Sequence, residues 1–201
     1  AGVYTVTRSG AQVTARRVRA DGLIITKTYE AGGVAHTMDV SVTFDNQSGS
    51  EMTPWVGVAD RMSGDAGRFS NAARPVAHVD GGVEHVTDLE DLIGDESETL
   101  DGPVRWYGVG NRYFFAVLIG DEVPVEGAKG GGVLVDQLPS GRVGVVELGA
   151  PLGPGASRSV HYTVYSGPKS LDALKALGHE LEDAVEYGWF GFFAKILLFV
   201  L

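Results

Sequence analysis

The sequence predicts a mainly β domain of two packed antiparallel sheets, followed by a C-terminal helix. Three observations support this prediction: a high glycine content, apolar residues that alternate with polar ones, and a change to helical spacing after Pro168. The 201-residue chain contains 29 glycines, which together with abundant valine and threonine indicate many short strands joined by tight turns. Short antiparallel strands bury their apolar faces by packing in two layers, so a β-sandwich is expected.

The clearest predicted strand covers residues 34–44, where apolar and polar residues alternate. A period of two places the apolar members on one face, with His36 as the one polar residue among them. The stretch before it is rich in β-branched residues and predicts a partner strand, and Gly32 and Gly33 supply the turn. Residues 45–50 have the composition of a loop. The apolar members are Val34, Met38, Val40, Val42 and Phe44.

The middle of the chain predicts further strands separated by glycine-rich turns. Residues 113–119 are apolar on both faces, so this strand should lie between two layers, with Trp106, Tyr113 and either Phe114 or Phe115 in the core. The glycine tract at 127–132 is interpreted as a hairpin and residues 139–141 as a turn. The predicted strands are 55–59, 104–109, 113–119, 133–138, 142–148 and 158–165.

From Pro168 onward the spacing of apolar residues becomes helical, and one helix is predicted over about residues 168–187. Pro168 suits the first turn of a helix, where its missing N–H has no intrahelical partner. Gly188 is a suitable stop. The stripe that would dock on the sandwich consists of Leu171, Leu174, Leu177, Leu181 and Val185.

Residues 189–201 form an apolar tail that only Gly191 and Lys195 interrupt. As a helix the tail would span roughly 20 Å, which is too short for a bilayer core of about 30 Å. Its composition favours a helix lying in the headgroup region. A buried core helix and the beginning of a longer membrane span remain as alternatives. The expected membrane-interface residues are Trp189, Phe190, Phe192, Phe193 and Lys195.

Composition argues against several functions. A formal net charge of −10 disfavours binding to nucleic acid and broad adsorption to anionic lipid. The chain has no cysteine, which excludes disulfides and thiol catalysis. The five histidines form no metal-binding pair, and His161 is interpreted as a hydrogen-bonded strand residue. The acidic run at 88–101 lacks the spacing of a calcium loop and is interpreted as a solvated loop or short helix. No catalytic, cofactor or metal site is therefore expected.

The C-terminal 37 residues resemble the junction between the periplasmic domain and the membrane core in YidC-type membrane-protein insertases. In that family a strand ends in a Tyr–x–Gly–Pro–Lys-like motif, and a helix, a Tyr–Gly–Trp-like turn and an amphipathic helix come after it. One departure is Ile196 after Lys195, where the family often has proline, so the start of the tail helix stays open. The matching residues are Tyr165, Gly167, Pro168, Lys169, Tyr187, Gly188 and Trp189.

Two upstream stretches are also similar to this family. Residues 23–49 look like its paired early strands, and residues 106–119 look like its core strand, with Trp106, Tyr113 and Phe114 at the matching positions. The resemblance implies a β-supersandwich like that of sugar mutarotases, with a helix docked on it. It implies a periplasmic domain over residues 1–187 and an amphipathic membrane-interface segment over residues 188–201.

The resemblance further implies a place between a first transmembrane helix, before Ala1, and a five-helix membrane core, after Leu201. The expected location is the periplasmic side of the inner membrane of a Gram-negative bacterium. The expected partners are Sec translocon components including SecDF, nascent membrane proteins and, through the tail, the bilayer surface. The domain is expected to be no enzyme but an accessory docking part of an insertase and chaperone.

Two other classes of function stay open at this point. A mutarotase-like fold would also suit a carbohydrate-binding or aldose-epimerase-like sandwich, although fold alone does not confer function. An adhesive or structural sandwich is the other class, and the apolar tail argues against it because a free secreted domain has no use for such a terminus.

Overall fold

A computed structural model describes residues 3–54, 57–59, 74–85, 98–120, 125–135, 138–145 and 151–185 of the chain. Twelve strands of these segments form one hydrogen-bonded network in which every described pair is antiparallel. The strands are β1 (Thr5–Ser9), β2 (Gln12–Val18), β3 (Leu23–Ala31), β4 (Thr37–Asn46), β5 (Gly57–Ala59), β6 (Arg74–Val79), β7 (Gly82–His85), β8 (Glu98–Gly110), β9 (Phe114–Gly120), β10 (Val125–Val135), β11 (Leu138–Val145) and β12 (Ser157–Pro168). The predicted mainly β, antiparallel class is confirmed.

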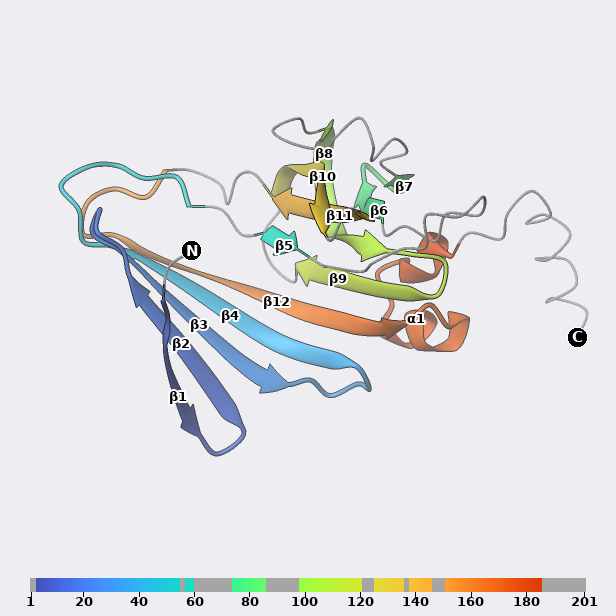
Figure 1. Cartoon of the computed structure of the whole chain (residues 1–201), viewed down its shortest axis with the longest axis horizontal. Helices are drawn as coiled ribbons and strands as arrows, with labels where there is room; N and C mark the ends of the chain where they lie inside the picture. Colours follow the sequence, from blue (N-terminus) through green and yellow to red (C-terminus); the bar gives the residue numbers. More distant parts are fainter. Residues whose placement is uncertain are drawn as a thin grey trace, which may run out of the picture.

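The strand order is β1-β2-β3-β4-β12-β9-β8-β10-β11-β5, and β6 pairs with both β7 and β8. In Figure 1 strands β1 to β4 and β12 form one arm, and strands β5, β6, β7, β8, β10 and β11 gather above β9. Hydrogen bonding is continuous between these two parts, so the supersandwich is one curved network rather than two separate sheets. The late strand β12 lies between β4 and β9 and joins the two parts.

The alternation predicted for residues 34–44 is confirmed along most of β4. Val40, Val42 and Phe44 are buried, and Ser41 and Thr43 between them are partly exposed. The strand begins only at Thr37, because a turn precedes it in which the N–H of Thr37 donates to the carbonyl of Val34 at 3.2 Å. Val34 therefore lies in the turn, and its side chain is exposed.

Strand β9 is covered on both faces, as predicted from its apolar sequence. Leu118 faces one buried cluster, which we call the sheet core, while Phe115 and Ile119 face a second cluster, which we call the junction core. The sheet core consists of Leu23, Val40, Val42, Phe44, Ala77, Val79, Val104, Tyr107, Val109, Leu118, Leu152, Val160 and Tyr162. The junction core consists of Val76, Trp106, Phe115, Val117, Ile119, Tyr165, Leu174, Leu181 and Ala184.

The glycine tract predicted as a hairpin forms one arm of an antiparallel pair, and the turn predicted at residues 139–141 is wrong. Residues 127–132 lie inside β10 and residues 139–141 lie inside β11, and these two strands pair with Gly132 opposite Gly141. Glycine adopts extended backbone as readily as turn conformations, so its presence alone did not locate the turn. The predicted strand at 133–138 instead spans the end of β10 and the start of β11. The acidic run is described only from residue 98, where it belongs to β8.

The single helix predicted over residues 168–187 is also wrong. Pro168 is the last residue of β12, and α1 (Leu171–Leu177) begins after the N-cap Ser170, whose Oγ accepts from the N–H of Ala173 at 3.2 Å. Gly178, His179 and Glu180 then have φ values of 72°, 59° and 61°, which a right-handed helix cannot contain. A short 3₁₀ helix, η1 (Leu181–Ala184), comes after this break.

The apolar stripe nevertheless reaches the core despite the broken helix. Leu174 and Leu181 are fully buried in the junction core, and Leu177 and Val185 pack against it. Gly188 and the whole tail at 189–201 lie outside the described residues. Neither α1 nor η1 has the length and apolar character needed to cross a bilayer.

Candidate functional site: the junction of the sheet and the C-terminal segment

The motif at the end of β12 shapes the exit of the chain from the sheet. The ring of Tyr165 is fully buried, and its Oη donates to the carbonyl of Pro168 at 2.6 Å. A Cβ atom on Gly167 would lie 2.7 Å from that same Oη, so only glycine leaves room for the phenol. Burial raises the pKa of Tyr165, which keeps the hydroxyl protonated as a donor. Tyr165, Gly167 and Pro168 therefore fix the direction in which the backbone leaves strand β12.

Lys169 joins three segments at this exit. Its backbone N–H donates to the carbonyl of Tyr113 at 2.7 Å, next to the start of β9. Its Nζ lies 5.2 Å from the centre of the Phe115 ring and donates to the carbonyl of Ala184 at 3.2 Å. A cation at the carbonyl end of a helical turn stabilises that end, so this lysine ties η1 to the sheet.

A second set of contacts holds the loop at residues 178–180 onto strands β6 and β8. The indole Nε1 of Trp106 donates to the carbonyl of His179 at 3.0 Å. The carboxylate of Glu180 contacts the guanidinium of Arg105, and its Oε2 lies 2.9 Å from Nε2 of His78. These contacts compensate the left-handed backbone of the loop, which non-glycine residues adopt at a cost of about 1–2 kcal/mol each.

The sequence analysis singled out only Trp106 among the residues of this loop contact, and the buried partner that it missed is His78. It is almost completely buried on β6, and its ring lies 5.8 Å from that of Trp106. No local motif links it to Glu180, which is about a hundred positions later in the chain. The detectable signal was Trp106, because a buried indole N–H normally has a hydrogen-bond partner.

His161 and His36 lie apart from this contact, to which His179 contributes its carbonyl. His161 is exposed on β12, opposite Ser41 of β4, on the face that the alternation predicted. His36 has a φ of 63° and places its ring edge-on to Tyr165 at 6.2 Å. Among the described residues, no three acidic or histidine side chains cluster as metal ligands would. The absence of a metal, a cofactor and catalysis stays a prediction.

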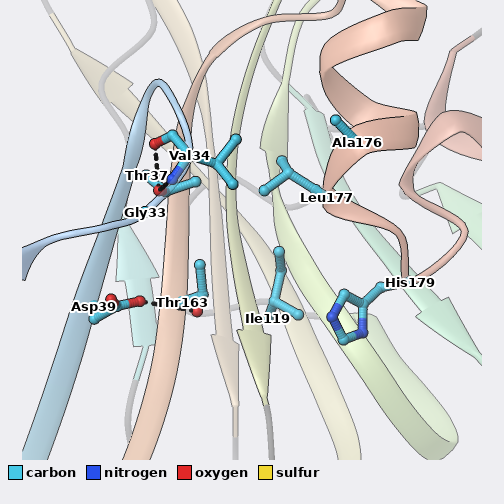
Figure 2. A pocket seen from close by; sticks show the side chains of 9 residues that line it. All are labelled: Gly33, Val34, Thr37, Asp39, Ile119, Thr163, Ala176, Leu177 and His179. Carbon is cyan, nitrogen blue, oxygen red and sulfur yellow. Dashed lines mark hydrogen bonds between the residues drawn. The ribbon is translucent and has the colours of Figure 1, made fainter.

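A small pocket of about 200 Å³ lies beside α1. Figure 2 shows Val34 and Leu177 pointing toward one another across it. Its polar side is already occupied, because Oγ1 of Thr163 donates to Oδ1 of Asp39 at 3.1 Å. The pocket therefore has a mixed lining, in which apolar side chains lie beside polar ones and the ring of His179. It is lined by Gly33, Val34, Thr37, Asp39, Ile119, Thr163, Ala176, Leu177 and His179.

A larger hollow of about 510 Å³ lies over β2, β3, β4 and β12. Cross-strand hydrogen bonds join polar side chains on this face, between Gln12 and Glu30 at 2.5 Å and between Thr43 and Ser159 at 2.8 Å. These hydrogen bonds pair some of the polar side chains of this face with one another. The hollow is lined by Gln12, Thr28, Glu30, Asp39, Val40, Ser41, His161 and Tyr162.

The expected core aromatics are only partly confirmed. Trp106 and Phe115 are buried in the junction core, whereas Tyr113 is 58% exposed and Phe114 is 54% exposed. The burial of Tyr113 was therefore a wrong prediction, because this residue lies in the turn before β9 begins. The five predicted membrane-interface residues, Trp189, Phe190, Phe192, Phe193 and Lys195, lie outside the described residues.

The fold is similar to that of sugar mutarotases. A galactose mutarotase-like protein from Lactobacillus casei matches with a TM-score of 0.56 at 12% identity, over 81% of this chain and 72% of that one. A putative aldose 1-epimerase from Escherichia coli matches with a TM-score of 0.55 at 8% identity, over 82% of this chain and 68% of that one. At such low identity the likeness shows the fold alone, and it confirms the mutarotase-like architecture.

Sequence relatives identify the family. The family described as the YidC periplasmic domain matches residues 2–200. A membrane protein insertase YidC from Anaeromyxobacter sp. (strain Fw109-5) is 33% identical over 195 residues, which is 91% of this chain and 34% of that protein. One from Geotalea daltonii is 28% identical over 184 residues, 88% of this chain and 33% of that protein. The chain thus spans about a third of the length of these relatives, and it belongs to the family of YidC periplasmic domains.

Proposed function

We propose that this chain is the periplasmic part of an insertase that helps membrane proteins enter and fold in the inner membrane of a Gram-negative bacterium. The observation that carries the proposal is the junction. Motif residues of β12 and the C-terminal segment pack into one core, and the chain leaves it at Val185 toward the apolar sequence 189–201. Residues 1–187 act as the periplasmic domain and residues 188–201 as the segment that leads to the membrane.

The proposed partners are molecules that a domain on the periplasmic side of the inner membrane can contact. Nascent membrane proteins are the substrates of the whole insertase, which acts with or without Sec translocon components such as SecDF. The tail meets the bilayer surface through Trp189, Phe190, Phe192, Phe193 and Lys195. An acidic domain with a net charge of −10 is suited to docking proteins rather than to adsorbing on anionic lipid.

In this proposal the sheet and the C-terminal segment contribute unequally to insertion. The sheet is an accessory docking surface, because we identify no site chemistry among its described residues and the chain is strongly acidic. The C-terminal segment contributes more, because it connects the domain with the membrane. Anchoring by four aromatic rings at the bilayer surface is worth several kcal/mol, on the order of 2 kcal/mol for each buried ring.

The test is insertion of a small membrane protein in cells that depend on the full-length protein. We expect deletion of residues 1–165 to reduce insertion less than replacement of Trp189, Phe190, Phe192 and Phe193 by serine, at matched protein levels. The control replaces three exposed valines of the distant strands, Val3, Val6 and Val18, by serine and should leave insertion unchanged. If cells died with the deletion of residues 1–165 but grew normally with the serine variant of the tail, the sheet would contribute more to insertion than the C-terminal segment, contrary to the proposal.

A further inference from the structure

The turn between β8 and β9 presents two aromatic rings to solvent. Tyr113 and Phe114 are more than half exposed, and no other aromatic side chain among those described reaches that exposure. Oδ1 of Asn111 accepts from the N–H groups of Tyr113 and Phe114, both at 2.8 Å, and the N–H of Asn111 donates to the carbonyl of Phe114 at 3.0 Å. The turn is therefore closed by hydrogen bonds and holds both rings outward.

The chemistry of this turn matches a membrane interface. The guanidinium of Arg112 lies 5.9 Å from the centre of the Tyr113 ring. Tyrosine rings concentrate at the headgroup level, where an apolar ring and a polar hydroxyl both find a suitable environment, and an arginine beside them reaches phosphate. Phe114 adds a purely apolar ring to the same turn.

The turn also lies where the chain leaves the described structure. Lys169 donates from its backbone to the carbonyl of Tyr113 and from its Nζ to the carbonyl of Ala184, so a single lysine spans the distance between the turn and the end of η1. The next residue, Val185, precedes the most apolar stretch of the sequence. Figure 1 shows α1 and the start of β9 at the same end of the molecule.

We propose that Arg112, Tyr113 and Phe114 form a second membrane contact, separate from the C-terminal tail, which seats the sheet against the lipid headgroups. The carboxylates of α1 and η1 at this end, among them Asp172, Glu182 and Asp183, disfavour anionic lipid. The contact therefore depends on insertion of the rings into a zwitterionic surface, and it responds little to salt.

The absence of cysteine from the chain allows a site-specific test. The full chain is made with the substitution Tyr113→Cys and, separately, with Val6→Cys as the control. Val6 is exposed on strand β1, at one edge of the sheet. Each is labelled with an environment-sensitive NBD fluorophore and mixed with phosphatidylcholine vesicles. We expect a blue shift and a severalfold rise in emission at position 113 and no change at position 6.

Variants without a label give a second measurement. Replacing both Tyr113 and Phe114 by serine should weaken co-sedimentation with the same vesicles by about tenfold, which corresponds to incomplete burial of two rings. Replacing Val3 and Val6 by serine should leave it unchanged. Both double variants remove exposed apolar side chains, so a general loss of hydrophobicity would affect them alike.

Several results would overturn the proposal. Emission at position 113 that stays unchanged while the protein co-sediments would mean that the tail alone binds lipid. Absence of any vesicle binding would exclude both contacts in this chain. A change at position 113 that needs no vesicles and grows with protein concentration would assign the turn to contact between two copies. None of these readouts measures insertion. Loss of the contact at position 113 alone leaves the proposed function standing, whereas absence of any vesicle binding would also remove the tail contact that the proposed function includes.

Discussion

The sheet core and the junction core lie on opposite faces of β9 and differ in how their polar groups are satisfied. In the sheet core the buried hydroxyls of Tyr107 and Tyr162 have no hydrogen-bond partner among the described residues. In the junction core the hydroxyl of Tyr165 and the indole N–H of Trp106 both donate to backbone carbonyls of the C-terminal segment. The tyrosine hydroxyls of the sheet core thus add no directional contact, although Nδ2 of the buried Asn46 donates to the carbonyl of Leu152 in this core at 2.8 Å. The polar groups of the junction core instead tie the C-terminal segment to the sheet.

The sheet core therefore contributes mainly to stability, whereas the junction core also positions the C-terminal segment. Apolar burial is nearly non-directional, so many sequences could build the sheet core. Hydrogen bonds are directional, and a buried group that loses its partner costs about 1–3 kcal/mol. We infer that the hydrogen bonds of the junction core fix how the segment up to Val185 lies against the sheet.

The largest expected effect is a difference in the free energy of unfolding between alanine variants of two neighbouring phenylalanines. Phe115→Ala should lower the free energy of unfolding by about 3–5 kcal/mol, because Phe115 is buried against Trp106 with ring centres 5.6 Å apart. Phe114→Ala should lower it by less than about 1 kcal/mol, because the ring is largely exposed. Urea unfolding of both variants checks this, and equal losses would contradict the description of β9.

A smaller effect should appear at alkaline pH. Burial raises the pKa of Tyr162 from 10.0 to about 12, and burial together with the proximity of Tyr162 raises the pKa of Tyr107 well above its usual value. The folded state then binds protons that the unfolded state has released, so stability is complete below pH 10 and declines as the pH rises toward 12. The loss from Tyr162 should be on the order of 1 kcal/mol at pH 11.

Unfolding measured at pH 9 and pH 11 checks this decline. Tyr162→Phe should lose less stability between these two pH values than the parent chain, because phenylalanine cannot ionise. Tyr113→Phe, at an exposed position, is the control and should decline like the parent. Identical declines for all three proteins would show that Tyr162 does not contribute.

The smallest expected effect compares the hydroxyls of the two cores at neutral pH. Tyr165→Phe should cost about 0.5–1 kcal/mol, because the carbonyl of Pro168 loses its donor. Tyr162→Phe should be neutral or slightly stabilising, because it removes a buried hydroxyl without a partner among the described residues. Amide hydrogen exchange should show faster opening of η1 only for Tyr165→Phe. The reverse ranking would remove the proposed distinction between the cores.

The presence of strands and the face on which their apolar side chains lie were predictable, because both depend on local periodicity. The alternation at 40–44 and the doubly apolar run at 115–119 each correspond to the burial observed. Turn positions were less predictable, since the glycines of 127–132 proved to be paired in a strand. The exposure of Tyr113 and Phe114 depends on where β9 begins, and a hydrogen bond between Asn111 and Phe114 decides that position.

Neighbouring residues were enough to predict the antiparallel β class, the family and the apolar stripe of the C-terminal segment, because periodicity and local motifs are properties of short stretches. The break of this segment at residues 178–180 became visible only in the folded chain. Gly178 is a local stop signal at the end of α1. The left-handed backbone of His179 and Glu180 depends in addition on Trp106, Arg105 and His78, which bind the loop from strands far away in the chain. Contacts over such separations compensate a left-handed backbone that local propensity disfavours, and no pattern of neighbouring residues records them.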